Sequence, residues 1–421
     1  MYAFKIVGGS KLIGQTEIKG AKNATLPLLI CSLLTDETVT IHNVSQLSDI
    51  KVLIEILRGI GTQIQIENDT IYLTTPQIKS TNAPYELLCK MRAGFWVIGP
   101  LLSRAGKAHV SLPGGCSLGA RKLDIYFDAL QNMGATINID GGYVSASGIL
   151  HGAEIFPHRI TVGGTITLLM AAVLTQGTTV IHNAAMEPEV EDVEKMLTAM
   201  GANIQGIGTN TLTIQGVNHL HGIEWTPVPD RIETATFAIA TALTKGNITL
   251  KGARLDLMNN TANILKNNGV VFAQTPDSLI IDATNATLKG QSIQTAEYPA
   301  LATDDQPCLT TMACLAQGES LITESIYDNR FMHVPELQRM GANIDVINNQ
   351  SILVHGVDHL TGATVTASDL RGGAALVLAG LVAQGETTVQ RIYHVDRGYY
   401  KMEEKLKALG ANVQRIWQEY P

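Results

Sequence analysis

Aromatic and charged side chains are scarce in this sequence. Phe, Trp and Tyr make up 5% of the 421 residues and charged residues 16%, whereas hydrophobic residues make up 45%. Extensive disorder requires many charges and few apolar residues, so this composition excludes it. A chain of this length is expected to form two or three domains, with aliphatic, alanine-rich cores.

The sequence has no surplus of basic residues. It contains 30 Lys and Arg against 38 Asp and Glu, for a net charge of -8. Nucleic acids and anionic membranes bind basic surfaces, so neither is an expected partner. No apolar run reaches the roughly 18 residues of a membrane span, and the N-terminus lacks the apolar segment of a secretory signal. The expected location is cytoplasmic.

Common cofactor and metal motifs are also missing. The five cysteines are odd in number and widely spaced, which favours neither a disulfide framework nor a zinc site. There is no GxxxxGK[ST], no GxGxxG after a strand and no HExxH. The sequence therefore predicts no cofactor and no metal.

What the sequence does contain is a sixfold repeat. A glycine followed by a short β-type run recurs at intervals near 70 residues, at Gly61, Gly134, Gly201, Gly269, Gly341 and Gly410. Such self-similarity indicates a repeated structural unit. Each glycine is expected to end an amphipathic helix with a positive φ angle. Each unit also has a helix that is apolar all round, and such a helix is expected to be buried. These helices are expected at 23–34, 92–103, 164–175, 233–244, 308–316 and 372–383.

The two ends of the sequence complement each other. The last unit is incomplete, and residues 1–21 parallel 352–365, so we expect the N-terminus to complete the sixth unit. This predicts an α/β fold of two inside-out α/β barrel domains, each of three units with helices inside and sheets outside. The predicted domains are 22–229, and 230–421 together with 1–21. An open solenoid is the alternative.

The few charges collect where the buried helices begin. Lys22, Arg92, Asp304, Asp369 and Arg371 all lie at or just before a predicted helix start. Helix N-termini bind anions, although Asp at such a position is also a common N-cap. A cation there is unfavourable unless an anion compensates it. The pattern predicts a binding site for a small polyanion.

A Pro- and Gly-rich segment adds a nucleophile or acid. Leu112-Pro113-Gly114-Gly115-Cys116 is followed by Arg121, and a nearby guanidinium lowers the pKa of a thiol. Arg330 and Arg397, which precede amphipathic segments, are further guanidinium groups suited to phosphate or carboxylate. The alternative is a surface turn with an incidental cysteine.

These residues lie within longer recognisable segments. They include 20–24, 112–121, 187–189, 229–234, 303–304, 329–337, 369–371 and 396–399. In this order, over the whole length, the chain resembles the UDP-N-acetylglucosamine 1-carboxyvinyltransferase family of the EPSP synthase superfamily. The resemblance implies transfer of the enolpyruvyl group of phosphoenolpyruvate to the 3′-hydroxyl of UDP-N-acetylglucosamine, with release of phosphate. This reaction is the first committed step of peptidoglycan synthesis.

The resemblance also implies roles for individual residues. Cys116 resembles the thiol that acts as acid, forms an adduct with phosphoenolpyruvate and is alkylated by fosfomycin. Asp304 resembles the base, and Lys22 and Arg397 resemble further catalytic groups. The implied substrate-binding residues are Lys22, Asn23, Arg92, Arg121, Lys122, Leu123, Asp124, Ile125, Arg159, Ile160, Thr161, Val162, Gly163, Asp304, Ile326, Arg330, Asp369, Arg371 and Arg397. The expected partners are the two substrates alone; the oligomeric state is open, and a monomer is compatible with the sequence.

The sequence departs from the family pattern at Ser48, Met186, Cys308 and Gly372-Gly373, none of which is a proposed acid, base or main anion-binding residue. Three alternatives remain. A shikimate 3-phosphate enolpyruvyl transferase would lack the cysteine segment, and an RNA 3′-phosphate cyclase-like protein would need a reactive histidine. An inactive paralogue acting as a binding protein would have no reason to keep acid, base and cations together.

Overall fold

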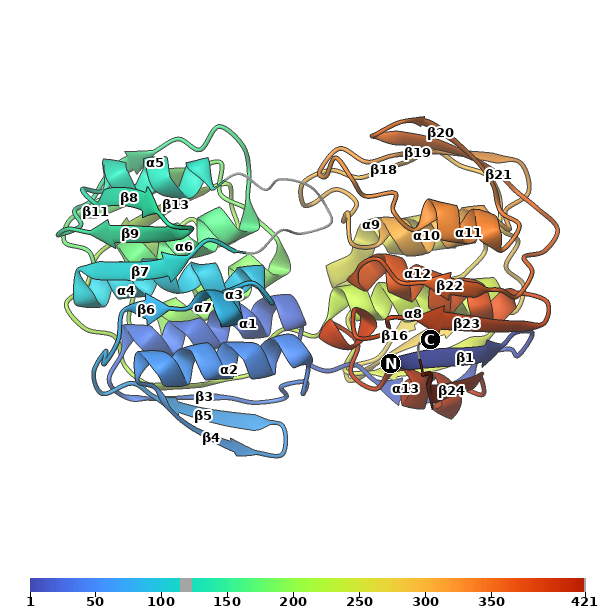
Figure 1. Ribbon diagram of the computed structural model, residues 1–421, viewed down its shortest axis with the longest axis horizontal. Coiled ribbons are helices and arrows are strands. Elements are labelled where there is room, and N and C mark those ends of the chain that lie inside the picture. Colours follow the sequence, from blue (N-terminus) through green and yellow to red (C-terminus); the bar gives the residue numbers. More distant parts are fainter. Residues whose placement is uncertain (114–122, 420–421) are drawn as a thin grey trace. The chain divides into compact units, whose positions relative to one another are not determined.

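Four-stranded sheets surround buried helices throughout the computed structural model, which describes residues 1–113 and 123–419 (Figure 1). These residues divide into two compact units. One contains 20–113 and 123–228, and the other contains 1–19 and 229–419. Each unit has three of the six sheets found among the described residues.

The unit containing residues 20–228 is built on three apolar helical segments. They are α1 (Lys22–Ile30) continued by η1 (Cys31–Leu34), η2 (Arg92–Val97) continued by α4 (Ile98–Ala105), and α6 (Val162–Ala172). In α6 every residue after the first is buried, as expected of a helix that is apolar all round. The surrounding helices are α2 (Ser48–Ile60), α3 (Tyr85–Leu88), α5 (Asp124–Asn132) and α7 (Pro188–Ala199).

The three sheets of this unit share one topology, with orders β14-β3-β5-β4, β6-β7-β9-β8 and β10-β11-β13-β12. Their strands are β3 (Thr38–Ile41), β4 (Gln63–Glu67), β5 (Thr70–Thr74), β6 (Asn82–Ala83), β7 (Lys107–Ser111), β8 (Thr136–Asp140), β9 (Tyr143–Ser147), β10 (Glu154–Ile155), β11 (Thr178–His182), β12 (Asn203–Gln205), β13 (Thr211–Gln215) and β14 (Ile223–Trp225). Because β14, the last strand, pairs in parallel with β3, the first, the unit closes on itself.

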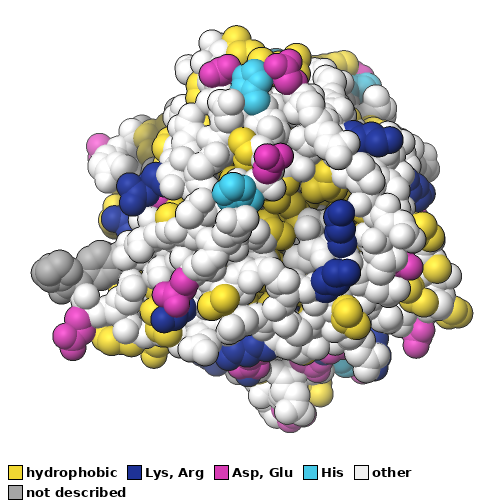
Figure 2. Space-filling model, turned by 90° about the vertical axis from the view of Figure 1, so that its right-hand side faces the viewer, with side chains coloured by type: hydrophobic (Ala, Val, Ile, Leu, Met, Phe, Trp, Pro, Cys, Tyr) yellow, Lys and Arg dark blue, Asp and Glu magenta, His cyan; other side chains and the backbone are white. Residues whose placement is uncertain are grey.

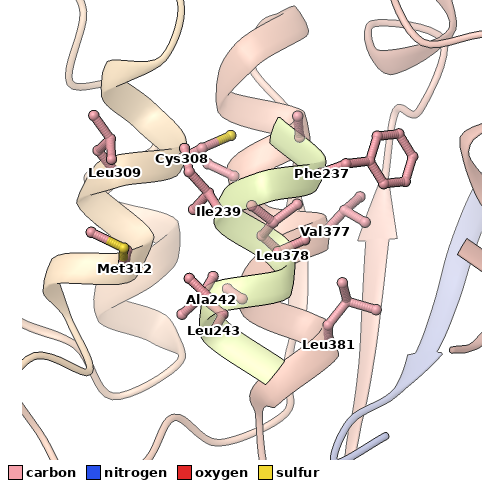
Figure 3. Close-up of a cluster of buried hydrophobic side chains, with 14 of the residues drawn as sticks. Phe237, Ile239, Ala242, Leu243, Cys308, Leu309, Met312, Val377, Leu378 and Leu381 are labelled. Carbon is pink, nitrogen blue, oxygen red and sulfur yellow. The ribbon is translucent and has the colours of Figure 1, made fainter. Parts of the chain in front are cut away.

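The other unit repeats this plan around α8 (Arg231–Thr244), α10 (Gln306–Ala313) and α12 (Leu370–Val382). Figure 3 shows these three helices packed side by side, with side chains such as Ile239, Cys308 and Leu378 between them, all fully buried. The remaining helical segments are η3 (Leu255–Met258), α9 (Asn259–Asn267), α11 (Val334–Arg339), η4 (Val395–Arg397) and α13 (Met402–Ala408).

The sheets of this second unit draw on both ends of the chain. Their orders are β16-β17-β15-β2, β18-β19-β21-β20 and β22-β23-β1-β24. The strands are β1 (Tyr2–Val7), β2 (Ile13–Glu17), β15 (Asn247–Lys251), β16 (Val271–Gln274), β17 (Ser278–Asp282), β18 (Ile293–Gln294), β19 (Glu319–Thr323), β20 (Asn343–Asn348), β21 (Ser351–His355), β22 (Thr364–Thr366), β23 (Glu386–Gln390) and β24 (Asn412–Trp417). Strand β1 pairs with both β23 and β24, so the N-terminus completes the sixth sheet as expected.

One expectation about the N-terminus needs correction. Strand β2 does not join the sixth sheet; it pairs in parallel with β15 in the sheet of the fourth repeat. In the other described sheets, the edge strand that pairs in parallel likewise comes from a neighbouring repeat; these strands are β6, β10, β14, β18 and β22. Residues 1–21 therefore contribute β1 to the sixth sheet and β2 to the fourth. The pairing of β14 with β3 and of β2 with β15 closes each unit and excludes an open solenoid, and the predicted α/β architecture is confirmed.

The six repeat glycines all have positive φ angles, between 83° and 127°, a region that favours glycine. Charged side chains lie scattered over the face drawn in Figure 2, in keeping with their low overall content. Within the described ranges, no helix has both the length and the apolar character needed to span a bilayer.

Candidate functional site

Asp304 lies between two buried arginines in the unit that contains residues 229–419. Arg330 donates from Nη2 to Asp304 Oδ1 at 3.1 Å, and Arg371 donates from Nε and Nη2 to Oδ2 at 3.2 and 3.1 Å. The arginines are 2% and 3% exposed, whereas the Asp304 side chain is 26% exposed. Buried cations require a partner, and this carboxylate provides one for both while staying accessible to a ligand.

Asp304 and Asp369, which the sequence allowed as N-caps, have different roles in the structure. Asp369 caps α12, since its Oδ1 accepts from the backbone N–H groups of Arg371 and Gly372 at 3.0 Å each. The same oxygen lies 4.0 Å from Arg330 Nη1. The N-cap position of α10 belongs to Asp305 and not to Asp304. The contacts of Asp304 are therefore those of an ion pair and not those of a helix cap.

Arg397 ends η4, a short segment that contacts α12, the helix of Arg371. The preceding residue, Asp396, accepts from Arg415 Nη1 and Nη2 at 2.9 and 2.7 Å. Arg415 also donates from Nε to Glu403 Oε1 at 2.6 Å. This network ties η4 to β24 and α13, and so fixes the backbone that carries Arg397.

The sequence reasoning missed Glu324, which connects Ile326 to Asp304. Glu324 is fully buried, and its Oε1 accepts from the backbone N–H of Ile326 at 2.9 Å. Its Oε2 accepts from the Thr303 hydroxyl at 2.9 Å, immediately before Asp304. No local pattern in the sequence marks Glu324, because its contacts join segments that only the fold brings together. Glu324 thus holds the segments of Thr303 and Ile326 together, which makes Glu324 a positioning residue.

Asp305 has an unusual protonation behaviour. Burial raises its pKa from 3.8 to about 7, although a 2.5 Å hydrogen bond from the Thr261 hydroxyl opposes the rise. Between about pH 4 and pH 7 the unfolded chain therefore loses a proton that the folded chain keeps, and the folded state loses stability as pH rises.

Asp305→Asn is expected to remove this pH dependence. The free energy of unfolding of the variant should rise relative to wild type by up to about 4 kcal/mol between pH 4 and pH 7, and the difference should then stay constant. Urea unfolding of both proteins at pH 4 to 8 measures it. A difference that does not change with pH would contradict the protonated state of Asp305.

In the unit containing residues 20–228, Lys22 begins α1 and pairs with Asp49 in the first turn of α2. Lys22 Nζ lies 2.9 Å from Asp49 Oδ2, and the two side chains are 11% and 4% exposed. The sequence argument required an anion beside Lys22, and a protein carboxylate meets part of that requirement. The same holds for Arg371, whose partner is Asp304.

Two segments that carry implied substrate-binding residues, 123–125 and 159–163, lie together in this unit. Asp124, the first residue of α5, accepts from Arg159 at 3.1 Å. A Cβ added to Gly163 in the first turn of α6 would lie 2.2 Å from Tyr126 Oη and 2.6 Å from Trp96 Nε1. Trp96 belongs to η2, which begins at Arg92 and contacts α1 and α6. The starts of α5 and α6 and the end of η2 are thus adjacent.

The other predicted residues of this unit also lie at or near helix starts. Asn23 follows Lys22 in α1, Leu123 precedes α5 and Ile125 is buried within it. Ile160 and Thr161 precede α6, and Val162 is its first residue. Three predicted residues, Cys116, Arg121 and Lys122, lie outside the described residues.

Comparison with known proteins relates this geometry to a family. The family model of EPSP synthase (3-phosphoshikimate 1-carboxyvinyltransferase) matches residues 6–406. The chain is 48% identical over 427 residues to the UDP-N-acetylglucosamine 1-carboxyvinyltransferase of Paramagnetospirillum magneticum, covering 99% of both chains. It is 47% identical over 430 residues to the protein of the same name from Agrobacterium fabrum, covering 99% of this chain and 100% of the relative.

Solved structures share the fold at lower identity. The enolpyruvyl transferase NikO from Streptomyces tendae superposes with a TM-score of 0.89 at 24% identity, covering 98% of each chain. The EPSP synthase from Acinetobacter baumannii has a TM-score of 0.79 at 19% identity, covering 99% of this chain and 100% of its own. The resemblance inferred from the sequence motifs is confirmed, and the chain belongs to the UDP-N-acetylglucosamine 1-carboxyvinyltransferase family of the EPSP synthase superfamily.

Proposed function

We propose that this protein transfers the enolpyruvyl group of phosphoenolpyruvate to the 3′-hydroxyl of UDP-N-acetylglucosamine and releases phosphate, the first committed step of peptidoglycan synthesis. The observation that carries the proposal is the identity of 46 to 48% over 99% of the chain to several proteins bearing that enzyme's name. The substrates are then phosphoenolpyruvate and the sugar nucleotide.

Asp304 is the proposed base. Its carboxylate accepts the proton of the 3′-hydroxyl as the oxygen forms a bond to C2 of phosphoenolpyruvate. Two hydrogen-bonding arginines, Arg330 and Arg371, favour the ionised form that this role needs and orient its oxygens. In the same addition step Cys116 is the proposed donor of a proton to C3, the methylene carbon.

The addition yields a tetrahedral intermediate, which then loses phosphate. Loss of a proton from C3 and cleavage of the C2–O bond to phosphate regenerate the enol ether on the sugar. The leaving phosphate needs cations, because its negative charge increases as the bond breaks. We assign this role to Lys22, Arg92, Arg121, Arg371 and Arg397, and assign the sugar nucleotide to the residues at the starts of α5 and α6.

An acceptor assay tests the proposed reaction against its nearest rival. The matching family model carries the description of a 3-phosphoshikimate enzyme, so shikimate 3-phosphate is the necessary second acceptor. With phosphoenolpyruvate present, we expect phosphate release with UDP-N-acetylglucosamine and an acceptor product heavier by one enolpyruvyl group. Turnover with shikimate 3-phosphate alone would overturn the assignment, and inactivity with both would favour an inactive paralogue.

We also propose a cytoplasmic location. Cys31, Cys89, Cys308 and Cys314 are free thiols in the described part of the chain, as is usual in a reducing compartment. Cys116 lies outside that part.

A further inference from the structure

An exposed group of two histidines and one carboxylate lies at the seam where the unit containing residues 20–228 closes. Glu37 directly precedes β3, and His219 and His221 lie just before β14. These strands are the first and last of the unit and pair in parallel, with Val39 opposite Ile223. Strand β3 can be found in Figure 1 beside β5 and β4. The group therefore joins segments that are more than 180 residues apart in sequence.

Two of the three distances between ligand atoms in this group are close to those of a metal site. Glu37 Oε1 lies 3.2 Å from His219 Nε2 and 3.2 Å from His221 Nδ1. All three ligand atoms lie within 4.8 Å of one another. Four ligands arranged tetrahedrally around Zn²⁺ at about 2.0–2.1 Å stand about 3.3–3.4 Å apart. An ion can enter this arrangement after small side-chain rotations.

The backbone around the group holds the three side chains in place. Leu220 is fully buried and its carbonyl accepts from the Thr35 hydroxyl at 2.6 Å, so the alternating residues His219 and His221 both face solvent. Gly222 N–H donates to Glu37 Oε2 at 2.8 Å, which leaves Oε1 toward the imidazoles.

The group is open to solvent. The side chains of Glu37, His219 and His221 are 48%, 48% and 67% exposed. An ion can therefore reach all three side chains from solvent.

We propose that Glu37, His219 and His221 bind one divalent transition-metal ion, of which Zn²⁺ fits best, and that the ion links the first and last strands of the unit. Two imidazole nitrogens and one carboxylate oxygen suit Zn²⁺, Ni²⁺ or Cu²⁺, whereas Mg²⁺ and Ca²⁺ prefer oxygen ligands alone. The fourth position is left for water or for a donor from another molecule.

This metal site is separate from the proposed chemistry. Lys22 begins the helix formed by α1 and η1, and Glu37 follows its other end, at Leu34. Thirteen helical residues span about 20 Å. A metal at Glu37 therefore acts on the stability of the unit and not on enolpyruvyl transfer, and the proposal does not depend on the function proposed above.

A zinc titration of the full chain tests the site. The chelator-treated protein is titrated calorimetrically with Zn²⁺ and compared with Glu37→Gln, His219→Ala and His221→Ala. Gln keeps an acceptor for Gly222 N–H but removes the charge. We expect one ion per wild-type chain and at least tenfold weaker binding in each variant. His182→Ala is the matched control, because His182 is a histidine of the same unit paired with one carboxylate, Glu154, at 3.0 Å.

Thermal unfolding tests the proposed link between the strands. Saturating Zn²⁺ should raise the midpoint of wild type and of His182→Ala by several degrees, because a ligand that binds only the folded state stabilises it. Zn²⁺ should not change the unfolding midpoints of the three site variants. Without zinc, the midpoints of these variants should be close to that of wild type. Equal zinc affinity in wild type and site variants would show that the three side chains form only a hydrogen-bonded surface cluster. Binding without a thermal shift would overturn the structural role.

Discussion

Asp304→Asn is expected to lower kcat by about a thousandfold, within the range typical for loss of a general base. Asn has nearly the same shape, and its Oδ1 can still accept from one of the two arginines, but its Nδ2 cannot accept and its amide cannot take up the proton of the attacking hydroxyl. Because the loss concerns proton transfer, KM for both substrates should change far less than kcat. Steady-state kinetics with each substrate varied in turn measures both constants.

The same substitution should also destabilise the fold. Arg330 and Arg371 are buried and would lose the negative charge that they share, which costs about 3 kcal/mol for a broken buried pair even though Asp369 stays 4.0 Å from Arg330. Asp305→Asn, one residue away, is the matched control and should keep wild-type kcat, because Asp305 accepts its hydrogen bond from Thr261, whereas Arg330 and Arg371 donate to Asp304. If Asp304→Asn lowers stability but keeps wild-type kcat, the ion pairs of Asp304 have only a structural role.

Cys116→Ser is expected to lower turnover at least a hundredfold, whereas Cys116→Asp should keep much of the activity. A serine hydroxyl is a far weaker acid than a thiol, but a carboxylic acid can still donate a proton to C3 of phosphoenolpyruvate. Neither variant should form the covalent phosphoenolpyruvate adduct through sulfur. Turnover assays and intact mass measurements with phosphoenolpyruvate check the two effects separately.

Cys89→Ser is the control for this series, since Cys89 is partly exposed and its thiol lies 3.6 Å from the Glu86 carbonyl. It should behave as wild type. The buried cysteines are poor alternatives for the chemistry, because burial raises the pKa of Cys308 and of Cys314 to about 12 and keeps both thiols protonated. Wild-type turnover by Cys116→Ser would remove the thiol from the proton-transfer step.

The repeated architecture could be predicted because its signals are local. A helix that is apolar all round has to be buried wherever it lies in the chain, and α6 and α12 begin within two residues of the predicted positions. The six glycines likewise reveal helix ends by their conformational requirement alone. The place of β2 was missed because strand pairing between distant segments depends on the closed fold.

The ion pairs could not be predicted from the same signals. Neither Asp49 beside Lys22 nor Glu324 between Thr303 and Ile326 is marked by a local pattern, because each pair joins different segments through tertiary packing. The choice between Asp304 and Asp305 as the cap of α10 depended on a one-residue difference in where the helix begins. The motifs identify the candidate residues, and tertiary packing determines their partners.

Phosphate release before and after fosfomycin treatment is the most direct test of the proposed reaction. The wild-type protein should release phosphate from phosphoenolpyruvate only when UDP-N-acetylglucosamine is present. Fosfomycin should abolish that release and add its mass to the peptide containing Cys116. Release that does not require the sugar nucleotide, or full activity with Cys116 alkylated, would contradict the account.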